Sequence, residues 1–118
     1  MGQPVVHFEI IARDPDAVRS YYGDLFEWEY DADNPVSYAV VRRQDDDAGI
    51  GGGIGSAPEG YAGHVTFYVE VDDVEASLAK AESLGGSRMM GPDKVMEGVE
   101  IGLFNDPEGN TVGVVKVG

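Results

Sequence analysis

The side chains best suited to acid–base chemistry are two histidines and one nearby carboxylate. His7 and Glu9 alternate in the segment VVHFEI, so both would project from the same face of a β-strand. His64 opens a comparable segment, HVTFYVE, further along the chain. An imidazole beside a carboxylate can move a proton near neutral pH, and Glu9 is the candidate catalytic base. The alternative is that both histidines are hydrogen-bonded structural residues.

The composition disfavours catalysis by a nucleophilic side chain. The chain has no Cys, which excludes disulfides, thiolate metal sites and thiol nucleophiles. Its two histidines both fall in expected strands, which gives no support for a Ser-His-Asp arrangement. The acid–base residues are therefore the main chemical signal.

Aromatic residues and glycines are the candidate walls of a small-molecule pocket. Amphipathic rings suit such sites, and Trp28, Tyr38, Tyr61 and Tyr68 are placed to contribute them. The segment GIGGGIG (49–55) lacks the spacing of a phosphate-binding loop. Its glycines are expected to open room for a ligand or for another part of the backbone.

The elements that would position these residues occur twice. Residues 5–12 are expected to form a strand, followed by a helix that Asp14 caps and that ends near Phe26. Three strands over 27–30, 36–42 and 50–54 complete the first half. After a linker-like stretch (55–63), the second half is expected to contain a strand (64–71), a helix capped by Asp73, and strands over 88–95, 99–104 and 111–117.

The two halves form an internal repeat of β-α-β-β-β units. One such unit buries the apolar face of its sheet poorly, so two units are expected to lie side by side. The alternation predicts that Phe8, Ile10, Phe67 and Val69 pack beneath the helices. The opposite phase, with both histidines, is then expected to line a shared concave surface.

Charge and length narrow the class of protein. The chain has 118 residues and a formal net charge of −14, which argues against nucleic-acid binding because phosphates require Lys and Arg. The same charge disfavours an anionic membrane surface, and no apolar run is long enough to span a bilayer. We expect one domain over 1–118 (modules 4–55 and 63–118) in a cytoplasmic protein.

The order of these segments resembles the vicinal oxygen chelate superfamily, which includes glyoxalase I, bleomycin-resistance proteins and extradiol dioxygenases. The resemblance rests on VVHFEI, DPDAVRSYYGDLFEWEY, DVEASLAKAESLGG and DPEGNTVGVV. It implies an α+β fold in which tandem β-α-β-β-β modules form a cupped, mixed eight-stranded sheet. It also implies a homodimer.

The resemblance places metal-ligand positions at His7 and His64 early in the modules, and at Gly52 and Gly113 late in them. Glycine has no ligand atom, and a catalytic metal normally takes three protein ligands. Glu9 or Glu100 would have to supply the missing carboxylate. No resident metal is therefore favoured, although a divalent metal at His7 and His64 stays open.

Three functional hypotheses follow. The first is a metal-free small-molecule-binding protein with a site formed by His7, Glu9, His64, Tyr68, Trp28, Tyr38, Gly52 and Gly113. The second is a metal-dependent glyoxalase-like lyase, epimerase or dioxygenase, in which a divalent metal polarises ligand oxygens. An interaction module without a ligand is a third possibility.

Overall fold

The computed structural model describes residues 2–31, 38–43 and 49–118. Within these residues the chain forms two helices and eight strands, in parallel and antiparallel pairs, which confirms the expected α+β class. The chain divides into two compact units. The first unit is His7–Val65, and the second unit is Thr66–Gly118 with the N-terminal residues up to Val6.

The first unit contains β1 (Val5–Ala12, from His7 onward), α1 (Pro15–Phe26), β2 (Tyr30–Asp31), β3 (Ala39–Val41) and β4 (Gly51–Ser56). β1 pairs in parallel with β4, and β3 lies antiparallel between β4 and β2. The expected strand over 27–30 is reduced to the short β2. Of the strand expected over 36–42, residues 36 and 37 lie outside the described residues.

Helix α1 begins where the sequence rules place it. The Asp14 side chain accepts a hydrogen bond from the Ala17 amide, and Pro15 occupies the first turn. Phe8 and Ile10 from β1 pack with Val18 and Tyr22 from α1 around buried Ile54. The predicted phase of β1 is therefore correct, and His7 and Glu9 lie on the strand face away from the helix.

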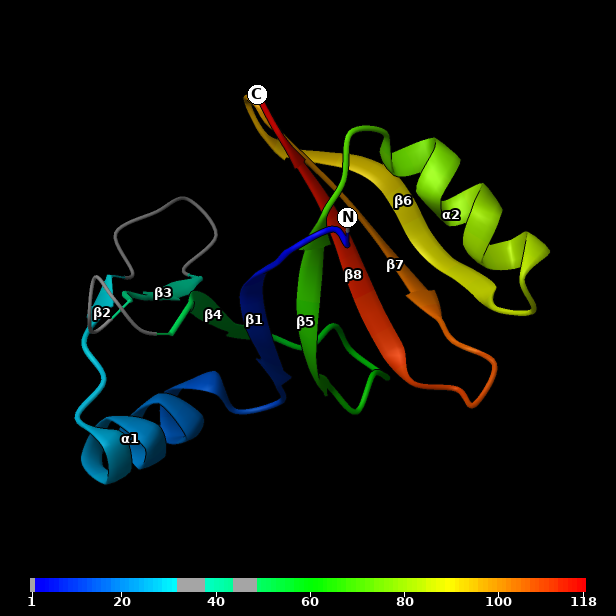
Figure 1. Cartoon of the computed structure of the whole chain (residues 1–118). Helices are drawn as coiled ribbons and strands as arrows, with labels where there is room; N and C mark the ends of the chain where they lie inside the picture. Colours follow the sequence, from blue (N-terminus) through cyan, green and yellow to red (C-terminus); the bar gives the residue numbers. More distant parts are fainter. Residues whose placement is uncertain (1, 32–37, 44–48) are drawn as a thin grey trace. The chain divides into compact units, whose positions relative to one another are not determined.

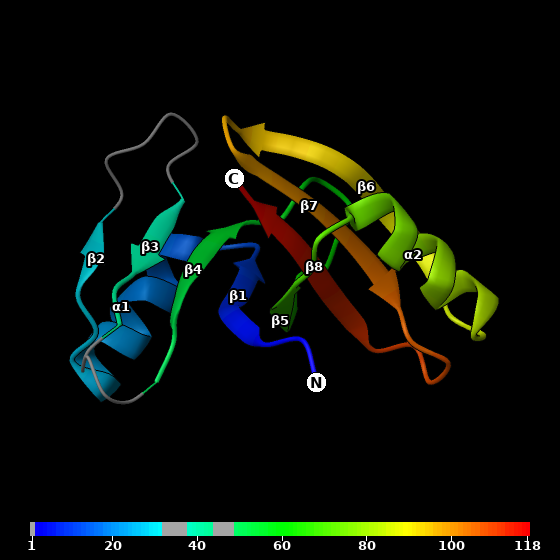
Figure 2. The same ribbon diagram turned by 45° about the horizontal axis from the view of Figure 1, so that its top comes forward.

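The second unit contains most of β5 (His64–Glu70), α2 (Val74–Ser83), β6 (Ser87–Met96), β7 (Val99–Asn105) and β8 (Thr111–Val117). β5 pairs in parallel with β8, while β7 is antiparallel to both β8 and β6. Figures 1 and 2 both show α2 lying along β6. Arg88 from β6 joins Glu75 and Glu82 of that helix by ion pairs.

Two apolar clusters stabilise the second unit. Val71, Val74, Leu78 and Val114 are buried together, with Val69 packed against them, as expected for the helix side of the sheet. The expectation for Phe67 is wrong, because its side chain is 42% exposed. The second cluster contains Tyr68, Leu103 and Val115. No helix in the described part of the chain is long and apolar enough to cross a membrane.

Candidate functional site

The first unit contains a chain of hydrogen bonds that joins both histidines to Glu9. His7 Nε2 lies 3.1 Å from the Tyr38 hydroxyl, which donates to Glu9 Oε1 at 3.1 Å. Glu9 Oε2 lies 3.0 Å from His64 Nε2, and His64 Nδ1 lies 2.6 Å from the Tyr61 hydroxyl. We call these five side chains the Glu9 relay: His7, Tyr38, Glu9, His64 and Tyr61.

The directions of these hydrogen bonds converge on the carboxylate. Because the Tyr38 proton points to Glu9, the Tyr38 oxygen accepts from His7, which must carry its proton on Nε2. An ionised Glu9 can only accept, so His64 donates to it from Nε2. When His64 is neutral, its Nδ1 accepts the proton of the Tyr61 hydroxyl. Glu9 thus receives a donor on each oxygen.

Burial sets the charge state around this carboxylate. The side chains of His64 and Glu9 are only 9% and 11% exposed, so their mutual hydrogen bond is largely shielded from water. Burial also lowers the pKa of His7 from its ordinary value of 6.5, and the neighbouring Glu9 carboxylate opposes that shift. The lowered pKa favours the neutral imidazole at His7, and the hydrogen bond to Tyr38 places its proton on Nε2.

Glycines in β4 make room for one member of the relay. A Cβ at Gly53 would lie 1.9 Å from the Tyr38 ring, and one at Gly55 would lie 2.9 Å from it. The ring therefore lies directly on the β4 backbone. The space that was expected to admit a ligand or another part of the backbone is filled here by the Tyr38 ring, whose hydroxyl donates to Glu9.

Tyr61 is positioned by the segment that leads into β5. The Ala57 amide donates to the Ala12 carbonyl at 2.8 Å, and the Tyr61 amide donates to the Pro58 carbonyl at 3.0 Å. At the other end, Gly63 adopts φ +101°, and a Cβ there would lie 2.2 Å from the Ile11 carbonyl oxygen. Both ends of this segment are thereby fixed to the end of β1.

Two of the expected site residues lie in apolar packing. Trp28 packs with the rings of Phe8, Tyr22 and Phe26. Tyr68 is 4% exposed and lies in the second unit against Leu103 and Val115.

Gly52 and Gly113, the two glycines of the expected site, also lie against aromatic rings. A Cβ at Gly52 would lie 2.4 Å from the Phe8 ring, and a Cβ at Gly113 would lie 2.5 Å from the Tyr68 ring. Gly52 pairs with Phe8 and faces the helix side of the strand, away from His7 and Glu9. On the histidine side of β4 stand Gly51 and Gly53, which pair with His7 and Glu9.

The residues present do not fit a three-ligand metal centre. In the described ranges, no three His, Asp or Glu side chains gather where they could hold a metal ion. The β4 residues opposite His7 and Glu9 are glycines, and the described ligand atoms of the relay bond to one another. Glu100, the alternative carboxylate, lies on β7 of the second unit, opposite Lys94 and Lys116 in the strand register.

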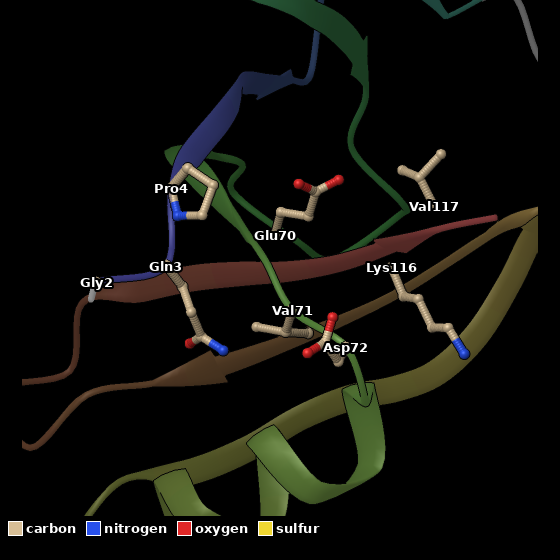
Figure 3. A pocket seen from close by; sticks show the side chains of 8 residues that line it. All are labelled: Gly2, Gln3, Pro4, Glu70, Val71, Asp72, Lys116 and Val117. Atoms are coloured by element: carbon tan, nitrogen blue, oxygen red, sulfur yellow. The ribbon is translucent and has the colours of Figure 1, made fainter.

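Each unit has a surface hollow. A hollow of about 560 Å³ in the first unit is lined by His64 with residues at the end of β1 and the start of α1, including Ile11, Arg13 and Val18. A hollow of about 410 Å³ in the second unit is lined by Glu70, Asp72 and Lys116 beside the N-terminal segment (Figure 3). Because His64 belongs to both the first hollow and the relay, the first hollow is the candidate ligand site.

Sequence reasoning identified His7, Glu9 and His64 as one group, and the structure brings them together. Tyr38 and Tyr61 were expected only as pocket walls. A signal for Tyr61 was present in its spacing, three residues before His64, which allows a local contact once the chain turns at Gly60. No comparable local signal exists for Tyr38, because its contacts are with strands far away in sequence.

Comparisons with known proteins agree on one family. The sequence profile of a glyoxalase-like domain matches residues 6–115. Proteins from Mycobacterium bovis and Mycobacterium tuberculosis, provisionally named glyoxylase CFP32, are 33% identical over 107 residues, which is 86% of this chain and 41% of each relative. The chain thus spans less than half the length of these curated relatives.

Solved structures support the same fold. A glyoxalase/bleomycin resistance protein/dioxygenase superfamily member from Vibrio splendidus 12B01 has a TM-score of 0.64 at 15% identity, covering 98% of this chain and 99% of that one. A variant of Streptomyces coelicolor methylmalonyl-CoA epimerase, in complex with 2-nitronate-propionyl-CoA, has a TM-score of 0.62 at 17% identity, covering 98% and 94%. At sequence identities this low, the similarity to these structures shows a shared fold and nothing more.

Proposed function

Because the chain belongs to the glyoxalase-like domain family of the vicinal oxygen chelate superfamily, we propose that it binds a small molecule at the Glu9 relay without a resident catalytic metal. The observation that carries this proposal is the convergence of donors on Glu9. Tyr38 and His64 each donate to a different oxygen of this buried carboxylate. A metal ion on His64 would have to displace one of its hydrogen bonds, because both of its ring nitrogens are already bonded.

The relay provides both recognition and acid–base capacity. His64 lines the hollow of the first unit and is backed by Glu9, so the relay can take up a proton from a bound ligand and return it. The net charge of −14 favours the approach of cationic ligands, with a dependence on salt. Glu9 is the residue proposed to hold or move the proton.

A metal-dependent lyase, epimerase or dioxygenase is the second candidate. It is favoured by the direct contact between the His64 imidazole and the Glu9 carboxylate, because both groups are common ligands of divalent metals. The epimerase among the structural neighbours belongs to the same superfamily fold. In this reading Glu9 would have to exchange its present partners for a metal.

Elemental analysis combined with thermal shifts distinguishes the two. Protein purified without an affinity tag should contain far less than one equivalent of zinc, nickel, iron or manganese, and a chelator should leave its melting temperature unchanged. A panel of neutral and cationic aromatic compounds should contain ligands that raise the melting temperature. At about 100 times the dissociation constant, a ligand adds roughly 2.7 kcal/mol of stability.

Matched variants assign the effect to the relay. Glu9→Gln and His64→Gln should weaken ligand binding at least tenfold, whereas Glu100→Gln, in the other unit, should leave the affinity unchanged. One equivalent of metal that is lost on replacing His7 or His64 would overturn the proposal in favour of the metalloenzyme. If a ligand binds both relay variants with unchanged affinity, its binding site is not at the Glu9 relay.

The remaining features of the proposal concern the whole protein. We propose a cytoplasmic homodimer in which residues 1–118 act as one domain, with modules over 4–55 and 63–118. Its partners are then a small molecule and a second copy of the chain, with no nucleic acid or membrane.

A further inference from the structure

We propose that Tyr61 is a base-activated phenol, and that it is the group of the relay that exchanges a proton with the ligand. This inference rests on the proposed function for its ligand, but the chemistry of Tyr61 itself can be tested without one. The ligand class would be a compound with a weakly acidic O–H or C–H bond. None of the comparisons assigns a role to this residue.

The geometry has the order hydroxyl, imidazole, carboxylate. The Tyr61 oxygen lies 2.6 Å from His64 Nδ1, and His64 Nε2 lies 3.0 Å from Glu9 Oε2. Because the Glu9 carboxylate accepts the proton on His64 Nε2, the other ring nitrogen, Nδ1, is available to accept a proton from Tyr61. The same logic activates hydroxyl nucleophiles in hydrolases, but here the hydroxyl is phenolic.

The orientation of the rings is fixed by the fold. The Tyr61 and His64 rings meet edge to face, with centroids 5.6 Å apart and planes at 72°. The segment that carries Tyr61 is fixed at Ala57 and at Gly63, both against the end of β1. The phenol is therefore held against the imidazole by backbone contacts on both sides of it.

Exposure decides which member of the relay meets the ligand. The His64 and Glu9 side chains are about nine-tenths buried, whereas Tyr61 is only partly buried. Tyr38, the other phenol, donates directly to the Glu9 carboxylate and lies on the glycines of β4. Tyr61 is thus the phenol that combines a nitrogen base behind it with a surface in front.

The proposed step balances within the relay. Tyr61 passes its phenolic proton to His64 Nδ1, which becomes an imidazolium facing the Glu9 carboxylate. The phenolate oxygen then takes the proton of the ligand's O–H or C–H bond, whose electron pair stays on the ligand. Return of that proton by the same route restores every group.

A phenol-directed electrophile tests this activation directly. With benzenesulfonyl fluoride, the Tyr61 oxygen would form a bond to sulfur, fluoride would leave, and His64 would take the phenolic proton. Peptide mapping by mass spectrometry measures the labelling rate of each tyrosine. Tyr21 is the internal control, because it is 62% exposed and no base is bonded to its hydroxyl among the described contacts.

We expect Tyr61 to be labelled at least ten times faster than Tyr21 in the native protein, and at an equal rate in urea, where the relay is absent. His64→Gln and Glu9→Gln should each lower the Tyr61 rate toward that of Tyr21. The ratio in the native protein decides the question even when a variant fails to fold.

The outcomes separate this inference from the proposed function. Labelling of Tyr61 at or below the rate of Tyr21 in the native protein overturns the inference, even when a relay-dependent ligand is found. Fast labelling that His64→Gln abolishes supports it, even when the compound panel yields no ligand and the proposed function fails. Fast labelling that both relay variants leave unchanged, in folded protein, also overturns it.

Discussion

Glu9 shows how a single buried carboxylate can organise the residues around it. Its side chain is 11% exposed, and an ion in such a place is tolerated only when its oxygens are hydrogen-bonded. Tyr38 and His64 provide those bonds. Replacing His64 therefore removes a donor from a buried charge, which costs roughly 1–3 kcal/mol of stability in addition to any loss of ligand binding.

The protonation of His7 should make stability depend on pH. Burial lowers its pKa below 6.5 in the folded protein, so the unfolded chain binds this proton more readily. The contribution of His7 is then fully present above pH 6.5 and is lost as the pH falls from 6.5 toward the lowered value. Urea unfolding between pH 8 and pH 5 should show this decline.

His7→Gln is the control for that measurement. Glutamine does not titrate, so the difference in unfolding free energy between the two proteins should change over the same pH interval. The many carboxylates titrate in both proteins and cancel in the difference. Parallel curves for the two proteins would mean that His7 does not titrate in the folded state as its burial requires.

Gly53 should tolerate no side chain while Tyr38 is present. A methyl group there would meet the Tyr38 ring at 1.9 Å, so Gly53→Ala should destabilise the protein by about 1–3 kcal/mol. In a Tyr38→Ala background the same change should cost far less. Chemical denaturation of the two single variants and the double variant gives the coupling energy, and additive effects would contradict the contact.

Among the elements, α2 is where we expect shortening of a buried side chain to destabilise the second unit most. Leu78 is fully buried beneath it, so Leu78→Ala should cost about 2–5 kcal/mol. Phe67, which the alternation predicted to be equally buried, is 42% exposed, and Phe67→Ala should cost only about 1 kcal/mol. Comparable losses in thermal unfolding would mean that Phe67 is covered in solution.

The segment between β4 and β5 should depend on one glycine more than on another. Gly60 and Gly63 both have positive φ, which costs a non-glycine residue roughly 1–2 kcal/mol. Only at Gly63 does an added Cβ meet backbone, at the Ile11 carbonyl oxygen. Gly63→Ala should therefore destabilise clearly more than Gly60→Ala in urea unfolding, and should slow the labelling of Tyr61. Equal effects would contradict the anchoring of this segment.

The sequence predicted the parts of these elements that depend on local rules. Asp14 and Asp73 cap their helices as expected, because an N-cap needs only a side-chain oxygen and an amide three residues later. The rings of Phe8 and Tyr68 beside Gly52 and Gly113 were not predicted, because each ring comes from a neighbouring strand that is distant in the sequence. The hydrogen bonds of Tyr38 could not be predicted for the same reason, because its partners His7 and Glu9 are distant in the sequence.

At the scale of the whole molecule, the charge and the exposed apolar residues act in opposite directions. A net charge of −14 keeps copies of the chain apart at low salt. Tyr21, Leu25 and Phe26 on α1 are each more than half exposed. We expect light scattering at micromolar concentration and physiological salt to give the mass of two chains, and a single-chain mass would remove the homodimer from the proposal.

The glycines of β4 also restrict the order in which this protein could change. A new His or Glu at Gly53 would collide with the Tyr38 ring, so that residue would have to become smaller first. Losing Tyr38 alone removes a donor from Glu9 before any new ligand is gained. A mutational route to a side-chain metal ligand on this strand therefore passes through a less stable intermediate that has lost Tyr38 and does not yet have the new ligand.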